Sequence, residues 1–163
     1  MNTDCKLYTN LINCRLAPWA CSKLHQDQKG FVPGHYITEH TCLASEVAHL
    51  SNSFDVDGLI ISLDQSKAYD RVDPLWLLRV LSAMRIDPDL VCMISAIIDT
   101  PQTRIRINSG YSGKYSLRRG LRQGDPLSCL LFNFSIEPLG TLWLLKPAPK
   151  HGGNPAYIYG DTC

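Results

Sequence analysis

The chain has 163 residues, of which 45% are hydrophobic and 19% charged, and its formal net charge is +1. This composition excludes a disordered chain and a polyanion binder that relies on overall charge, so a nucleic-acid surface would have to be a local patch. No run of 18 apolar residues and no signal peptide occur in the sequence, so we expect neither a membrane span nor secretion.

The first fifty residues predict two helices. Residues 6–17 should form the first and Pro18 should end it. Its apolar residues at helical spacing are Leu7, Leu11, Ile12 and Leu16. A loop rich in Gly, Pro and polar residues follows, and residues 37–50 predict a second helix. Its apolar face would carry Leu43, Val47 and Leu50.

The middle of the chain predicts one strand and two helices. Residues 59–63 (LIISL) are a short β-branched run typical of a buried strand. The two helices open alike, Asp73 before Pro74 and Asp87 before Pro88. In this pattern the aspartate caps the helix and the proline takes its first position.

The last third predicts a β-hairpin, a long helix and a final strand. Alternation over residues 103–117 predicts the hairpin. The helix should open at Pro126 and kink near Pro138. The run AYIY, residues 156–159, predicts the strand. Because helices and strands are interspersed without βαβ periodicity, the expected class is α+β, with helices packed on a small antiparallel sheet.

Seven cysteines occur, and no two of them have C-x-x-C spacing. An odd number without a leader predicts reduced, mostly buried thiols in an intracellular protein. Nothing in the sequence distinguishes the nucleus from the cytoplasm.

Two aspartates, Asp64 and Asp161, each follow an apolar run predicted as a strand. A single strand-end aspartate more often caps the next turn. If the two strands lie side by side, however, the carboxylates converge and need a cation between them. Paired Mg²⁺ ions bound by carboxylates are the phosphoryl-transfer device of polymerases.

Basic residues are concentrated between residues 103 and 125. They are Arg104, Arg106, Lys114, Arg118, Arg119 and Arg122. A solvated hairpin face and a track for a phosphate backbone are both open interpretations. The segment RRGLRQGDPLS places arginines, glycines and a glutamine ahead of a helix N-terminus, where anions are favoured.

Four segments, in the correct order, resemble the reverse transcriptases of non-LTR (LINE-type) retrotransposons. DQKGFVPGHYI (27–37) resembles a fingers segment, and LDQSKAYDRVD (63–73) the first palm motif. RRGLRQGDPLSCLLFN (118–133) is similar to the second palm motif, and YIYGDT (157–162) to the third. The resemblance spans nearly the whole chain.

The resemblance implies a fingers-like part over residues 1–50 and a palm-like part with the fingers hairpin over 51–163, without a thumb. It implies an RNA-directed DNA polymerase acting on an RNA template, a DNA primer and dNTPs. Asp64 and Asp161 match the family's catalytic aspartates, which bind Mg²⁺ or Mn²⁺. Tyr69 matches the aromatic residue under the incoming sugar, which excludes a 2′-hydroxyl; a core aromatic is the other interpretation.

Other motif residues match nucleotide contacts. Gln123 and Gly124 match the pair that touches the incoming nucleotide and the template base. Lys67 is a further nucleotide-binding candidate. Lys67 and Asp70 also have a simpler interpretation as local structure. The arginines of the basic patch would contact nucleic acid.

The sequence also departs from the family pattern. Thr162 stands where the third motif has a second aspartate, and His35 replaces the arginine expected to meet the triphosphate. The chain ends one residue after Thr162, within the third motif. We therefore expect a truncated copy that is inactive by itself. The alternative is a non-catalytic remnant that binds nucleic acid weakly or has no function.

Overall fold

The computed structural model describes residues 3–55, 61–99 and 102–144. Helices dominate this part of the chain. They are α1 (Thr3–Cys21), α2 (Ile37–Phe54), α3 (Ala68–Arg71), α4 (Pro74–Ala83), α5 (Pro88–Ile98) and α6 (Pro126–Leu144). The short strands are β1 (Gln102–Thr103), β2 (Arg106–Ile107), β3 (Gly110–Tyr111) and β4 (Tyr115–Ser116).

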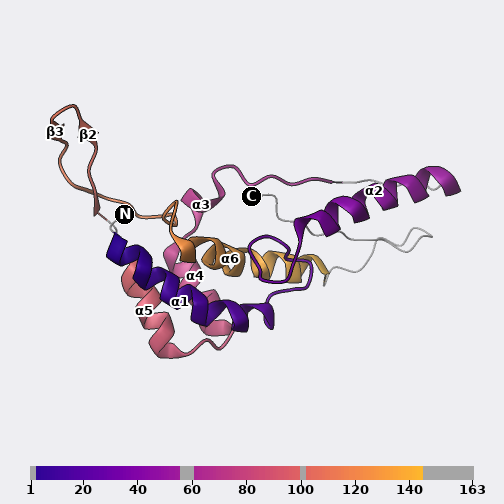
Figure 1. Ribbon diagram of the computed structural model, residues 1–163, viewed down its shortest axis with the longest axis horizontal. Helices are drawn as coiled ribbons and strands as arrows, with labels where there is room; N and C mark the ends of the chain where they lie inside the picture. Colours follow the sequence, from indigo (N-terminus) through magenta and orange to yellow (C-terminus); the bar gives the residue numbers. More distant parts are fainter. Residues whose placement is uncertain (1–2, 56–60, 100–101, 145–163) are drawn as a thin grey trace.

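Four helices form the body of the molecule (Figure 1). α6 packs against α1 and α4, and α4 packs against α5. α2 extends away from this body on one side, and the tip of the hairpin, β2 and β3, projects on the other (Figure 1). The main helix contacts in the described residues therefore join helices to one another. Packing of helices on a sheet stays a prediction, because the strands expected at residues 59–63 and 156–159 lie wholly or partly outside the described residues.

The core is centred on the first half of α6. Its apolar side chains there are almost completely buried: Leu127, Leu130, Leu131, Phe132 and Phe134. The surrounding helices contribute Ile12, Leu16, Ala20, Leu77, Leu81 and Ile94. A helix that is apolar on most of its circumference needs cover on most sides, which α1 and α4 provide.

The first helix is longer than predicted, and only part of its apolar set is buried. It continues through Pro18 to Cys21. Because Pro18 lies in the last turn, its missing N–H costs a single hydrogen bond, and burial of Ala20 against the core favours continuation. Leu7 and Leu11, two of the four apolar residues at helical spacing, are 62% and 61% exposed. Packing against α6 selects the narrower stripe that contains the buried Ile12 and Leu16.

The predicted helix openings are confirmed. The Asp73 carboxylate accepts hydrogen bonds from two backbone amides of α4, at 2.9 and 3.2 Å. The Asp87 carboxylate accepts one from α5, at 2.8 Å. Pro74 and Pro88 take the first helical positions. These local signals need no tertiary context, because the cap is formed within four residues.

α2 begins at Ile37 as predicted and ends at Phe54, four residues later than expected. None of its residues is buried, although all of them lie in the described part of the chain. Asp55 closes the helix in the left-handed conformation, with φ at 50° and ψ at 44°.

The predicted strand at residues 59–63 is not present where the structure describes it. Residues 61–63 have no regular structure, and Ile61 and Leu63 are 63% and 69% exposed. An apolar run becomes a strand when a neighbour supplies backbone hydrogen bonds. Residues 59–60 and the expected partner strand, 156–159, lie outside the described residues.

The hairpin is confirmed as two antiparallel pairs, β1 with β4 and β2 with β3. In the second pair Arg106 lies opposite Tyr111 and Ile107 opposite Gly110. Ile105 and Ile107, which share one face of the hairpin in the sequence pattern, are both exposed. The α+β class agrees with this mixture of helices and small antiparallel pairs.

Two further expectations concern the environment of the chain. Six cysteines in the described part are free, and the prediction that most would be buried is wrong, since three are exposed and three half-buried. Within the described ranges, every helix is too short or too polar to cross a membrane.

The core assignment predicts a large contrast between two leucines on α4. Leu77 is fully buried, whereas Leu75 is 68% exposed. We expect Leu77→Ala to lower the free energy of unfolding by about 2–5 kcal/mol, because it leaves a cavity beside α6. The matched change Leu75→Ala should stay within about 0.5 kcal/mol. Urea unfolding followed by circular dichroism measures both, and equal effects would contradict this core.

Candidate functional site

Two segments that the sequence analysis singled out are joined through their backbones. The Gly120 amide donates to the Val72 carbonyl at 2.8 Å, and the Leu121 amide donates to the Tyr69 carbonyl at 2.8 Å. These bonds place the end of the 63–73 segment beside the start of the 118–133 segment. We call this junction the seam, comprising residues 69–73 and 119–123.

Gly120 is required for the close approach at the seam. Its φ is +102°, in the region that side chains with a Cβ rarely adopt. A Cβ at this position would lie 3.1 Å from the Asp70 Cα and 3.2 Å from the Asp70 carbonyl oxygen. The glycine therefore meets both a conformational and a steric requirement.

Polar side chains also cross the seam. The Gln123 Nε2 lies 3.4 Å from the Asp70 Oδ1, and the Arg119 Nε lies 3.7 Å from the Asp73 Oδ2. Gln123 and Asp70 are both exposed, as is Arg119. Contacts of this length in water are weak, so the two backbone bonds hold the seam while the side chains stay accessible.

Tyr69 is the residue of the seam that contacts the core. Its ring stacks on Phe132 of α6, with centroids 5.1 Å apart and planes inclined by 28°. The residue is half-buried. The contact ties the seam to α6 and agrees with the core interpretation of Tyr69, while its partial exposure leaves part of the side chain at the surface.

Lys67 precedes α3 in the left-handed conformation, with φ at 55° and ψ at 48°. Its carbonyl accepts a hydrogen bond from the Arg71 amide at 3.2 Å, and its side chain is exposed. The residue therefore shapes the turn into α3, as its local-structure interpretation requires. Its role as a nucleotide contact stays a prediction.

Only one of the two candidate metal ligands lies in the described residues, so the distance between them is not given. Asp64 is exposed, in the segment before α3. Asp161 lies outside the described residues. Within the described ranges, no group of three or more His, Cys, Asp or Glu side chains could hold a metal ion. Convergence of Asp64 and Asp161 therefore stays a prediction.

The N-terminus of α6 is occupied by the protein's own carboxylate. Asp125 is 5% exposed, and its Oδ1 accepts from the Leu127 amide at 3.0 Å. The Ser128 hydroxyl donates to the Arg122 carbonyl at 2.7 Å, which fixes the turn before the helix. Because Asp125 supplies the negative charge that a helix start favours, the prediction that this end takes an anion receives no support.

The arginines of the basic patch differ in orientation. Four are exposed: Arg104, Arg106, Arg118 and Arg119. Arg122 is half-buried, and its Nη1 lies 3.5 Å from the Cys5 Sγ on α1. The patch available to a partner therefore consists of the hairpin and the residues that follow β4. Arg122 is turned toward the body.

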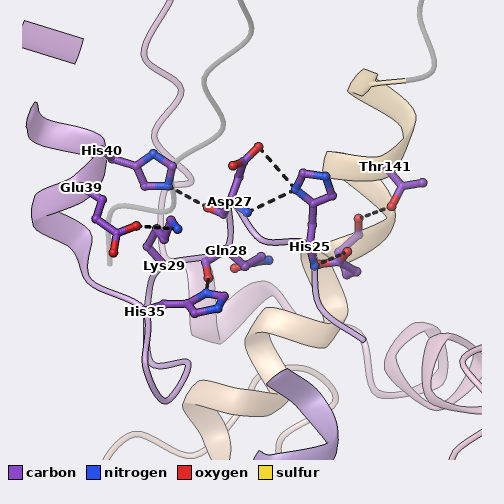
Figure 2. Close-up of polar contacts among 9 residues, drawn as sticks. His25, Asp27, Gln28, Lys29, His35, Glu39, His40 and Thr141 are labelled. Carbon is purple, nitrogen blue, oxygen red and sulfur yellow. Dashed lines mark hydrogen bonds and ion pairs between the residues drawn. The ribbon is translucent and has the colours of Figure 1, made fainter. Parts of the chain in front are cut away.

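His35 has a structural partner. Its Nδ1 lies 2.6 Å from the Gln28 carbonyl oxygen (Figure 2). This contact spans the turn between Gln28 and His35. Nearby, the His40 Nε2 lies 2.7 Å from the Asp27 carbonyl oxygen (Figure 2). Both imidazoles brace the loop that precedes α2.

The sequence analysis did not single out a buried polar cluster beneath this loop. It consists of Gln28, Asn133 and Glu137, which are 0%, 0% and 8% exposed. The sequence does contain a signal for this cluster: Asn133 and Glu137 stand within the otherwise largely apolar α6. Buried polar side chains need specific partners, so such residues indicate a polar contact in the interior.

Comparison with known proteins identifies what the chain resembles. The family model described as reverse transcriptase (RNA-dependent DNA polymerase) matches residues 1–162. The Transposon TX1 uncharacterized 149 kDa protein of Xenopus laevis is 32% identical over 138 residues, 85% of this chain and 11% of that protein.

Two further relatives are polyproteins of retrotransposable elements. The Retrovirus-related Pol polyprotein from type-1 retrotransposable element R2 of Popillia japonica is 37% identical over 135 residues, 82% of this chain. A Pol polyprotein from a type-2 element of Drosophila melanogaster is 27% identical over 130 residues, 78% of this chain. The chain spans 19% and 12% of these two relatives.

The seam predicts that Gly120→Ala is strongly destabilising. A side chain at this backbone conformation costs roughly 1–2 kcal/mol, before its clash with Asp70 is counted. Gly113, in the hairpin, has no left-handed φ, and a Cβ added there would have no heavy atom within 4 Å. Gly113→Ala should therefore be neutral or stabilise by up to about 1 kcal/mol. Thermal unfolding of both variants checks this, and equal midpoints would contradict the role of Gly120.

Proposed function

This chain belongs to the reverse transcriptase (RNA-dependent DNA polymerase) family, and on that premise we propose that it carries the nucleotide-binding part of an RNA-directed DNA polymerase. The family inferred from the sequence motifs is confirmed, and the relatives are proteins of non-LTR retrotransposons. In the proposed architecture, residues 1–50 are fingers-like and residues 51–163 are palm-like.

The seam is the observation that carries this proposal. It brings together motif segments that are about fifty residues apart in the chain, Tyr69 on one side and Gln123 on the other. Groups held on fixed backbones position a bound reactant. Here an aromatic ring could pack on the sugar of a nucleotide and an amide could hydrogen-bond to its base. We assign Tyr69, Gln123 and Gly124 to the nucleotide, with Lys67 at the edge of the same turn.

A divalent ion is part of the proposal. The reverse transcriptase family generally uses divalent metal ions. We propose that Asp64 and Asp161 are the ligands for Mg²⁺ or Mn²⁺. When bound, such ions stabilise charge on the attacking and leaving oxygens of a phosphoryl transfer. Exposure of Asp64 is compatible with an ion that is shared with a nucleotide.

Template and primer are the proposed macromolecular partners. The exposed hairpin arginines, Arg104 and Arg106, and their neighbours Arg118 and Arg119 form a positive surface close in sequence to the seam. Phosphate contacts of this kind bind without reading sequence. An intracellular location, where such templates occur, belongs to the same proposal.

A non-catalytic nucleic-acid-binding remnant is the second candidate. It is favoured by Thr162, which replaces a metal-binding carboxylate with a hydroxyl, and by His35. The imidazole of His35 is engaged with the Gln28 carbonyl, so it is not arranged as a bidentate guanidinium would be. The two candidates share the basic patch and differ in catalysis.

The patch predicts salt-sensitive and sequence-independent binding of RNA and DNA. Arg104→Ala with Arg106→Ala should weaken binding and reduce the log–log salt slope by about 1.4–1.8, at 0.7–0.9 per phosphate contact. The control is Arg15→Ala with Arg79→Ala, which removes the same charge from exposed positions on α1 and α4. Fluorescence anisotropy at several salt concentrations measures both pairs. Equal slopes for the two double variants would exclude the hairpin as the contact surface.

We also predict that this 163-residue chain does not extend a primer on an RNA template. Thr162 weakens the metal site and His35 removes a fixed positive charge, and each loss of preorganised charge costs on the order of 100-fold. The measurement is primer extension with dNTPs and Mg²⁺ or Mn²⁺, with Asp64→Ala as the control. Products that disappear in Asp64→Ala would show a working polymerase and overturn the remnant interpretation.

A further inference from the structure

The tip of the hairpin places an arginine beside a tyrosine. β2 pairs with β3 in antiparallel fashion, and Arg106 is the cross-strand neighbour of Tyr111 in this pair. Directly opposed residues of an antiparallel pair project from the same face, with their Cβ atoms about 4.5–5.5 Å apart. One face of the tip therefore carries a cation and an aromatic ring side by side.

Both side chains are open to solvent. Tyr111 is 65% exposed, and Arg106 is exposed as well. The tip projects away from the helical body, so none of the described helices covers it (Figure 1). A single exposed aromatic residue is ordinary in a folded protein. Its pairing with an exposed cation is the feature that indicates a ligand.

The backbone of the tip is already ordered for this arrangement. Asn108 and Ser109 connect the two strands, and Asn108 has a φ of 52°, as the first position of a two-residue hairpin turn requires. Behind the tip, the Ser112 amide donates to the Ile105 carbonyl at 2.9 Å, and the Ser112 hydroxyl accepts from the Ile105 amide at 2.9 Å. A ligand at the tip therefore does not have to order the backbone that binds it.

The charge of the hairpin has one sign. Residues 102–117 contain Arg104, Arg106 and Lys114 and have no aspartate or glutamate. All three cations are exposed, and in the part of the chain that the structure describes none of them forms an ion pair. Because the net charge of the whole chain is only +1, this positive potential is local to the hairpin. The ligand is therefore anionic.

A nucleotide with an unpaired base matches both groups of the pair. Its phosphate accepts hydrogen bonds from a guanidinium, and its flat base stacks on an aromatic ring. In a duplex the phosphates remain accessible, but each base is stacked between its neighbours and its faces are covered. An acidic peptide supplies the negative charge without the flat ring system. The combination of Arg106 and Tyr111 thus favours a single strand over both.

We propose that the hairpin tip binds single-stranded nucleic acid, with Arg106 on a phosphate and Tyr111 stacked on an unpaired base. The inference rests on the proposed function, because it names the form of nucleic acid that the hairpin part of the basic patch takes. It assigns unpaired template to the tip, and leaves the paired template and primer to other surfaces. Arg104 and Lys114 add positive charge along the same hairpin.

The hairpin also contains a matched control for Tyr111. Tyr115 is 45% exposed, but its cross-strand neighbour is Thr103, which carries no charge. Between the two strand pairs, residues 112–114 stand opposite residues 104–105, so the hairpin is bulged there. The two tyrosines therefore share one hairpin and differ in the residue that faces them.

Fluorescence anisotropy with two labelled probes tests the proposal. The probes are a short oligouridylate, which has no paired bases, and a blunt RNA duplex of the same length. Tyr111→Ala should weaken binding of oligouridylate on the order of tenfold, as expected for the loss of one stacked base, and leave duplex binding unchanged. Tyr111→Phe keeps the ring and should bind as the natural protein does. Tyr115→Ala should also retain the natural affinity.

Salt dependence separates stacking from a damaged hairpin. Tyr111→Ala removes no charge, so the log–log salt slope for oligouridylate should stay at the natural value. Arg106→Ala removes one phosphate contact and should lower that slope by about 0.7. A hairpin that had lost its shape would instead lower the affinity and the slope together in Tyr111→Ala, and for both probes.

The outcomes distinguish this inference from the proposed function. Equal weakening of both probes by Tyr111→Ala, or the same loss in Tyr111→Phe, would overturn stacking at the tip and leave the basic patch intact. Competition by polyglutamate as effective as by unlabelled oligouridylate would show a surface that reads charge alone, with the same consequence. Failure of the natural protein to bind either probe at low salt would overturn the inference and the proposed nucleic-acid partners together.

Discussion

The need to bury the apolar surface of α6 is the constraint on which the other parts of this structure depend. Its first half presents apolar side chains in every direction, from Leu127 to Phe134, and all of these must leave water. α1 and α4 take two of its sides, and Tyr69 stacks on Phe132 from a third. Segments far apart in the chain thus meet because they share one buried helix.

The seam is a consequence of how α6 begins. Asp125 caps the helix from inside the protein, and the turn before it brings Gly120 against the backbone of Asp70. The two segments that resemble polymerase palm motifs are therefore fixed to each other by backbone bonds and one glycine. Exposed polar side chains such as Gln123 remain available for a ligand.

The second half of α6 has a different role. There Glu137 holds the loop before α2 through a polar contact, as Asn133 does from the middle of the helix, while His35 bonds within the same loop. His35 thus has a structural role of its own, since its imidazole satisfies a backbone carbonyl of Gln28.

The sequence by itself determined the family, the α+β class and every signal that is complete within a few residues. The Asp73 and Asp87 caps, the hairpin and the start of α6 are of this kind. The tertiary structure decided which faces are buried: it left Leu7 and Leu11 in solvent and gave residues 61–63 no strand. It also enclosed Glu137. Such outcomes depend on partners distant in the chain, because burial and strand pairing are properties of two surfaces, whereas a helix cap is a property of one segment.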